Sequence, residues 1–187
     1  MFFKKSNNAT ETQLQKAAQE LKGGSVEAFR ILYGKYNQKV YRFCLRMLGD
    51  EAEAKDAFQE TFIKIYEHRF EFQGLNFSSW LFTIARRICL NTIRSRKNYG
   101  ILDDEYLEPQ KENQSDFGAQ AYISRAIASL PVALREALIL REYEECSYQE
   151  IAGILGIELS LAKIRVHRAR ILLRNILKPL QKELYES

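Results

Sequence analysis

The sequence has few of the residues that build disulfide frameworks, metal centres or membrane spans. Its 187 residues include only three cysteines, Cys44, Cys89 and Cys146, which form no CxxC pair, and two histidines, His68 and His167, which do not lie at zinc-ligand spacing with them. We therefore expect buried free thiols in a reducing compartment, no metal and no cofactor. No stretch approaches the ~20 apolar residues of a membrane-spanning helix, and the N-terminus lacks the apolar run of a signal peptide. We expect a cytoplasmic protein without membrane insertion.

Proline is also scarce, and no alternating pattern typical of strands occurs. Apolar residues instead recur at steps of three and four, which predicts helices almost throughout. A first helix is expected over about 11–22. Ser25 is placed to cap a second helix that Gly49 ends, and Asp50 to cap a third that runs to about His68.

Charge divides the chain into segments of opposite sign. The segment 80–97 holds five basic residues and no acid, whereas 98–118 holds six acids, one lysine and no helical period. We read 98–118 as an acidic flexible linker between two small helical domains, 1–97 and 119–187. The expected fold class is all-α, and the second domain is expected to be a four-helix unit with a helix-turn-helix.

The helix-turn-helix is predicted from the spacing of residues after position 146. Ser147 and Glu150 fit a capping box that opens a short helix, and Gly156 ends it where a positive φ is needed. A second helix begins within three residues, and Ala152 is small where the two helices cross. This arrangement favours a DNA-binding unit over a plain helical hairpin.

The second helix of this motif has one apolar and one basic face. Its core-facing residues recur at steps of four, three and four: Ala162, Val166, Ala169 and Leu173. Seven residues on or beside the opposite face are candidates for contact with nucleic acid: Ser160, Lys163, Ile164, Arg165, His167, Arg168 and Arg170. Lysine and arginine on such a helix can meet guanine acceptors or phosphates in the major groove. The alanines on the inner face suit tight helix packing better than lipid contact.

The last helix of the first domain carries a second basic track, and an aromatic loop precedes it. We expect Ser78 or Ser79 to cap this helix. Basic side chains beside aromatic ones are typical of proteins that bind single-stranded nucleic acid. Aromatic residues at helical spacing, such as Trp80, nevertheless more often pack in a core. The candidate residues for this contact are Phe72, Asn76, Phe77, Arg86, Arg87, Asn91 and Arg94.

Four stretches together resemble a known family. They are DAFQETFIKIY at 56–66, FSSWLFTIARR at 77–87, LPVALREALILREYEECSYQEIAGILGI at 130–157 and KIRVHRAR at 163–170. In order and spacing the chain is similar to bacterial RNA polymerase sigma factors of the extracytoplasmic-function (ECF) type, over roughly residues 20–178.

The resemblance implies a non-catalytic promoter-specificity subunit. Such a subunit binds the clamp helices and the flap of core RNA polymerase, and it also binds promoter DNA. The seven candidates of the aromatic loop and the helix after it, which we call the −10 set, would hold the melted −10 strand. The seven candidates of the helix-turn-helix, which we call the −35 set, would read the −35 element as duplex. An anti-sigma factor is implied as a further partner. The residues that would contact the polymerase clamp helices, the polymerase set, are Asp56, Gln59, Glu60 and Lys64.

Four positions depart from the common family pattern. Asn is frequent at the position of Arg87, Ser at Glu158, Gly at Ser160 and Ser at Ile164. A phosphate contact is therefore expected from Arg87 in place of a base contact. The other three departures predict an altered −35 sequence preference.

Two other function classes stay open from the sequence. A stand-alone helix-turn-helix regulator would share the second domain, but it does not explain the basic helix beside the aromatic loop in the first. A helical enzyme with a metal at Asp56, Glu60 and His68 lacks a second carboxylate–histidine pair facing them, a glycine-rich phosphate loop and a nucleophile motif.

Overall fold

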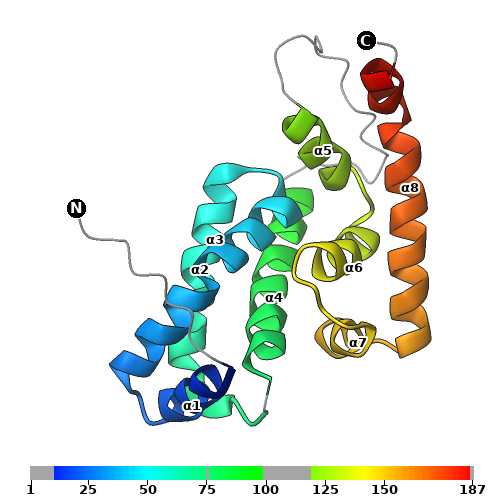
Figure 1. Cartoon of the computed structure of the whole chain (residues 1–187). Coiled ribbons are helices and arrows are strands. Elements are labelled where there is room, and N and C mark those ends of the chain that lie inside the picture. The colour runs from blue at the N-terminus through cyan, green and yellow to red at the C-terminus, as the bar shows by residue number, and fades with distance from the viewer. Residues whose placement is uncertain (1–10, 75, 99–118, 186–187) are drawn as a thin grey trace.

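The computed structural model describes residues 11–74, 76–98 and 119–185, and within these ranges it contains α-helices and one short 3₁₀ helix but no strand (Figure 1). The all-α prediction is confirmed. In chain order the elements are α1 (Glu11–Lys22), α2 (Val26–Leu48), α3 (Glu51–Glu67), η1 (Arg69–Glu71), α4 (Phe77–Asn98), α5 (Ala119–Ala128), α6 (Val132–Glu142), α7 (Tyr148–Leu155) and α8 (Leu159–Tyr185).

The predicted boundaries of the first three helices are confirmed, and the predicted caps of α2 and α3 are present. The Ser25 hydroxyl accepts the Ala28 N–H at 3.2 Å at the start of α2, and Gly49 ends that helix with φ of 70°. The Asp50 carboxylate accepts the Glu53 N–H at 2.9 Å at the start of α3. At the starts of α2 and α3, one of the four orphan N–H groups therefore has a side-chain acceptor close in sequence.

The predicted cap of α4 is wrong. The Asn76 side-chain oxygen accepts the Ser79 N–H at 2.9 Å, so the helix begins at Phe77 and both Ser78 and Ser79 lie inside its first turn. Asn and Ser are comparable capping residues. Asn76 is the cap because the helix already includes Phe77, whose side chain is buried.

The first domain is built on α2, α3 and α4, with α1 packed against α2. Its core includes Leu32, Phe43, Ile65 and Phe82, all fully buried. Cys44 and Cys89 are buried free thiols, as predicted, and so is Cys146 in the second domain. A hydrogen bond with Cys44 and burial raise the pKa of the Cys89 thiol, which keeps it protonated.

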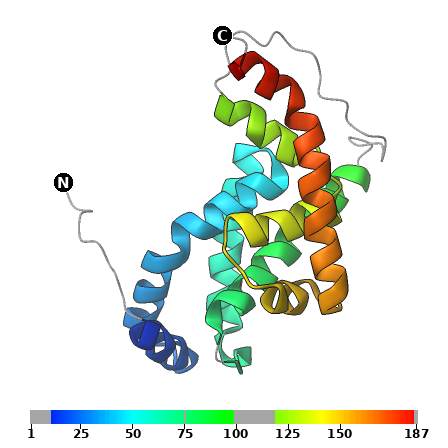
Figure 2. The same cartoon turned by 45° about the vertical axis from the view of Figure 1, so that its right-hand side comes forward.

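The second domain packs α5, α6 and α7 against the long α8. Leu130, Leu138 and Ala169 form a small apolar cluster where α6 meets α8. In both views α8 lies on the side of the molecule away from α1 (Figures 1 and 2). Of the linker predicted at 98–118, Asn98 is the last residue of α4, and 99–118 lies outside the described residues.

The two domains pack directly against each other. Helix α4 contacts α7, and α2 contacts α5 and α6. One apolar cluster runs through both domains, from Phe43 and Phe82 in the first to Ile139 and Ile151 in the second. At the same interface the Arg135 guanidinium donates to the Met47 carbonyl at 2.6 Å. The second domain thus sits where it can cover one side of α4.

Candidate nucleic-acid interfaces

The helix-turn-helix forms as its local sequence predicts. The Glu150 N–H bonds the Ser147 hydroxyl at 3.2 Å, and the Glu150 carboxylate accepts the Ser147 N–H at 2.7 Å, which completes a capping box. Gly156 takes φ of 66°, and the Ile157 N–H bonds the Ala152 carbonyl at 3.0 Å. The turn between α7 and α8 is therefore short, and a backbone hydrogen bond fixes it at the end of α7.

Helix α8 presents its two faces as predicted. Ala162, Val166 and Ala169 are completely buried, and Leu173 is half-buried. Five members of the −35 set lie exposed on the opposite face: Ser160, Lys163, Ile164, His167 and Arg168. The inner face is made of small side chains, so α8 lies close to its neighbours, while the outer face is open to a ligand.

The other two members of the −35 set form ion pairs with α6. Arg170 donates from Nε to the Glu142 carboxylate at 2.8 Å, in an exposed pair. Arg165 donates to Glu136 at 3.3 Å and is only 23% exposed in its side chain. Of the cations in the −35 set, Lys163 and Arg168 have no ion pair among the described residues, while Arg165 and Arg170 are partly neutralised.

The −10 set divides into free and paired residues along α4. Arg87, Asn91 and Arg94 are exposed at positions i, i+4 and i+7, so they follow one side of the helix. Arg86 faces the second domain instead, where its Nε lies 2.7 Å from one oxygen of Glu136 and its Nη2 3.2 Å from the other. The stripe Arg87–Asn91–Arg94 is therefore the open cationic track of the first domain.

Asn76 also contacts the second domain. Besides capping α4, its amide donates to the Glu150 carboxylate at 2.7 Å. Hydrogen bonds from the Ser147 backbone and hydroxyl, with a smaller one from Asn76, hold the pKa of Glu150 below its ordinary value. Glu150 is therefore an ionised acceptor shared between the α7 cap and the start of α4.

Phe72 and Phe77 of the −10 set do not offer the ring faces that the sequence suggested. Phe72 is 2% exposed and Phe77 is 5% exposed. Their centroids lie 5.6 Å apart in an edge-on contact, and both pack on Trp80. In this structure neither phenylalanine can stack on a base, because the rings are used to fix the loop to α4. The core alternative weighed for Trp80 fits its half-buried position in this cluster.

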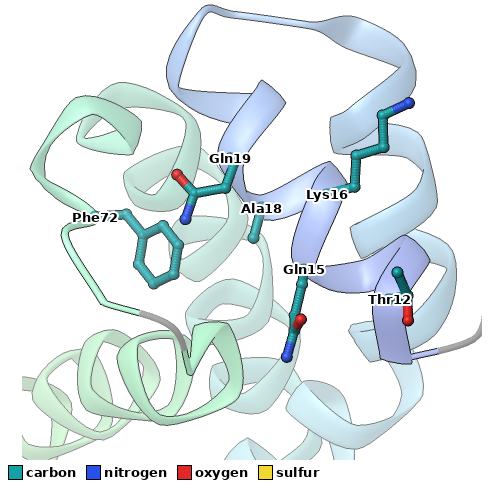
Figure 3. Close-up of a pocket in the computed structure, with 6 residues that line it drawn as sticks. All are labelled: Thr12, Gln15, Lys16, Ala18, Gln19 and Phe72. Atoms are coloured by element: carbon teal, nitrogen blue, oxygen red, sulfur yellow. The ribbon is translucent and has the colours of Figure 1, made fainter.

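A shallow pocket of about 300 Å³ lies between α1 and the aromatic loop (Figure 3). Gln19 points toward the Phe72 ring, and Lys16 points away from it. The ring is almost fully covered, and the other lining groups are buried Ala18 and four exposed polar side chains of which only Lys16 is charged. The pocket therefore provides neither a stacking face nor a cluster of charges. It carries none of the basic residues of the −10 set.

The polymerase set lies together on α3. Asp56, Gln59 and Glu60 are exposed, and Lys64 donates to Glu67 at 2.8 Å, a hydrogen bond that raises the pKa of the lysine. This face is separate from the α4 track and from α8 in the second domain. The structure thus keeps three polar surfaces on three different helices.

Two classes of site are absent from the described part of the chain. No group of three or more histidine, cysteine or acidic side chains there is arranged to hold a metal ion. Among the same residues, no helix combines the length and apolar character needed to cross a membrane. The Asp56, Glu60 and His68 alternative therefore has no metal cluster to support it.

Glu136 is the functional candidate that sequence reasoning missed. Its side chain is 3% exposed, and it is bound by Arg86 from the first domain and by Arg165 from α8. On the sequence it is one acid of a mixed helical stretch, and no local pattern distinguishes it from Glu142. Its partners Arg86 and Arg165 lie 50 and 29 residues away in the sequence. Helical spacing relates only residues a few positions apart, so it cannot predict these pairs.

Comparisons with known proteins match both domains. Residues 32–99 match the family model described as Sigma-70 region 2, and residues 120–173 match the one described as Sigma-70, region 4. The chain is 31% identical over 186 residues to the ECF RNA polymerase sigma factor SigW of Bacillus subtilis (strain 168), covering 91% of this chain and all of that protein. It is 32% identical over 190 residues to the RNA polymerase sigma-H factor of Pseudomonas aeruginosa, covering 93% and 98%.

Solved structures share the arrangement of helices. The sigma factor RpoE, in a co-crystal structure with the anti-sigma factor NepR from Bartonella quintana, superposes with a TM-score of 0.70 at 26% identity, over 82% of this chain and 98% of that one. CnrH, in complex with the cytosolic domain of CnrY, gives a TM-score of 0.68 at 20% identity, over 88% and 97%. The second likeness supports the fold alone.

Proposed function

We propose that three surfaces of this chain have three separate binding functions. The chain belongs to the ECF sigma factors of the sigma-70 family and is a promoter-specificity subunit of RNA polymerase. The first domain, 1–97, binds core polymerase and the −10 element. The second, 119–187, binds the −35 element, and the acidic segment 98–118 connects them.

The observation that carries this proposal is the two-faced α8. Three residues of its inner face are completely buried, while Lys163, His167 and Arg168 stand exposed on the other. A helix-turn-helix held by a capping box places such a face in the major groove, where the two cations meet phosphates or base acceptors. Counterion release at each neutralised phosphate makes the binding steeply dependent on salt.

On α4, the exposed stripe Arg87–Asn91–Arg94 is suited to follow the phosphates of a melted −10 strand. Asn76 and Arg86 join this track when their contacts with the second domain are released. Phe72 and Phe77 support the loop from within, as their burial indicates. The −10 surface is therefore a cationic track on an aromatic scaffold.

The exposed polar face of α3, with Asp56, Gln59, Glu60 and Lys64, is the proposed contact with the clamp helices of core polymerase. The second domain contacts the flap. An anti-sigma factor is a further proposed partner, supported by the complex with NepR in which the related RpoE was solved. The protein acts without catalysis of its own, in the cytoplasm.

A gel-shift experiment tests the function. A duplex promoter fragment should be bound tightly and specifically only when core polymerase is present with the chain. Tight specific binding by the chain alone would instead identify a stand-alone regulator. Promoter sequences can first be obtained by run-off sequencing with reconstituted holoenzyme.

Single substitutions on α8 test the −35 surface. Lys163→Ala or Arg168→Ala should each lower −35-dependent transcription by roughly tenfold, the cost of one lost DNA contact, while binding to core polymerase is unchanged. Loss of polymerase binding in either variant would contradict the proposed separation of binding functions.

A further inference from the structure

The contact between the two domains is centred on one buried carboxylate. Glu136 on α6 is 3% exposed, and both of its oxygens accept hydrogen bonds from Arg86 on α4, at 2.7 and 3.2 Å. Arg165 on α8 reaches the Oε1 atom at 3.3 Å. A two-pronged arginine–carboxylate pair has the same donor geometry that arginine uses toward a phosphate group.

The two arginines come from the two proposed DNA-binding sets. Arg86 belongs to the −10 set and Arg165 to the −35 set, so one acidic side chain holds a cation from each. Neither is free in this arrangement, since their side chains are 22% and 23% exposed. A guanidinium whose Nε and Nη2 donate to Glu136 cannot present the same edge to a DNA phosphate.

A second polar contact has the same effect. The Asn76 amide donates to Glu150, which belongs to the cap of α7 in the helix-turn-helix. This exposed hydrogen bond joins the start of α4 to α7, and the two helices also pack against each other. Two members of the −10 set, Asn76 and Arg86, are thus occupied by residues of the second domain.

We propose that Arg86, Glu136 and Arg165 form an interdomain latch that keeps the free chain in an autoinhibited, closed state. Glu136 takes the place of a DNA phosphate on Arg86, and the −10 surface is completed only when the domains separate. This inference rests on the proposed function, because it assigns regulation to the same surfaces.

The chemistry of the latch suits a reversible contact. A buried ion pair adds little net stability compared with apolar residues of the same volume, because desolvation of the charges offsets their attraction. The ion pair does, however, make the closed state depend on the Glu136 carboxylate, which a competing anion can replace. Promoter phosphates are such anions, so DNA and closure compete for Arg86.

Glu136→Gln tests the latch, and Glu142→Gln is the matched control. Both variants remove one negative charge from α6 and release one arginine of α8. Among the described residues, however, Glu142 pairs only with Arg170, which lies in the same domain. Small-angle scattering of each full chain reports domain separation. Binding of a fluorescein-labelled, mixed-sequence single strand, without polymerase, reports the exposed −10 surface.

The latch predicts that Glu136→Gln raises the radius of gyration and tightens single-strand binding by about tenfold or more, the effect of losing charge-assisted hydrogen bonds across the interface. Glu142→Gln should leave the scattering unchanged and alter binding by less than about twofold, as expected for an exposed pair. Equal effects of both variants, unchanged scattering of Glu136→Gln, or expansion without tighter binding would each overturn the proposal.

Arg86→Gln removes the other partner of the same ion pair, and the side chain of Arg86 is more exposed than that of Glu136. It should expand the chain as Glu136→Gln does, without the gain in strand binding, because the arginine itself is lost. If Glu136→Gln loses helical circular dichroism, Arg86→Gln decides the scattering result. Scattering needs neither DNA nor polymerase, so failure of the latch and failure of polymerase-dependent transcription by the unmodified chain are separate results.

Discussion

Glu144 makes the stability of the chain depend on pH. It lies in the turn between α6 and α7, it is 8% exposed, and its Oε2 atom has no hydrogen-bond partner among the described residues. Burial raises its pKa from the ordinary 4.5 to about 7, with a small addition from Glu145. Three cations of α2, Lys39, Arg42 and Arg46, oppose this rise without cancelling it.

The sign and size of the effect follow from the two pKa values of Glu144. Because the folded state holds the proton more tightly than the unfolded state, the free energy of unfolding falls as pH rises from about 4.5 to about 7. With one pH unit equivalent to about 1.4 kcal/mol, the carboxyl costs about 1 kcal/mol near pH 5 and about 3 kcal/mol near pH 8. The glutamine of Glu144→Gln cannot ionise. From pH 5 to pH 8 the free energy of unfolding of this variant should therefore rise by about 2.5 kcal/mol relative to that of the unmodified chain.

Urea unfolding followed by circular dichroism at both pH values measures this gain. The buried amide of Gln adds its own cost, but that cost does not change with pH, so the difference between the two pH values isolates the carboxyl of Glu144. Glu145→Gln is the matched control, since its side chain is exposed in the same turn. A gap between Glu144→Gln and the unmodified chain that stays constant from pH 5 to pH 8 would refute the reasoning.

Three further predictions concern DNA and backbone. Arg87→Ala combined with Arg94→Ala should impair promoter opening more than duplex recognition, and a normal permanganate footprint would contradict the −10 assignment. Ser147→Ala should lower the free energy of unfolding by about 1 kcal/mol through loss of the α7 cap, and an unchanged urea midpoint would argue against it. Gly156→Ala should destabilise by about 1 kcal/mol, because alanine disfavours the left-handed φ of 66°. Gly153→Ala, inside α7 and also free of neighbours at its Cβ, should stabilise by about 0.5–1 kcal/mol, and a shift of both variants in one direction would refute the backbone argument.

The sequence predicted those features that depend on neighbours within one or two helical turns. The capping box of Ser147 and Glu150 and the left-handed Gly156 require only adjacent residues, so their pattern is sufficient. The buried face of α8 follows in the same way, since small side chains at Ala162 and Ala169 recur at helical spacing.

What the sequence could not predict depends on long-range packing. Phe72 and Phe77 could equally stack on bases or fill a core, and only the position of Trp80 in three dimensions shows that they pack together. In the same way, helical period identifies Arg86 as flanking the basic track. It cannot show that this side of α4 meets Glu136, 50 residues later in the chain.

The closed arrangement affects the two proposed DNA surfaces unequally, and this orders the steps of promoter binding. Lys163, His167 and Arg168 are exposed while the domains are packed, so contact with duplex does not require their separation. On α4, by contrast, Arg86 donates to Glu136, so the −10 track is incomplete until α4 and α6 part. With the assignments proposed above, contact at −35 can precede opening of the chain, whereas capture of the melted strand must follow it. Separation of the domains and melting of the DNA are then coupled through Arg86, because the residue that leaves Glu136 is the one that the displaced strand can bind.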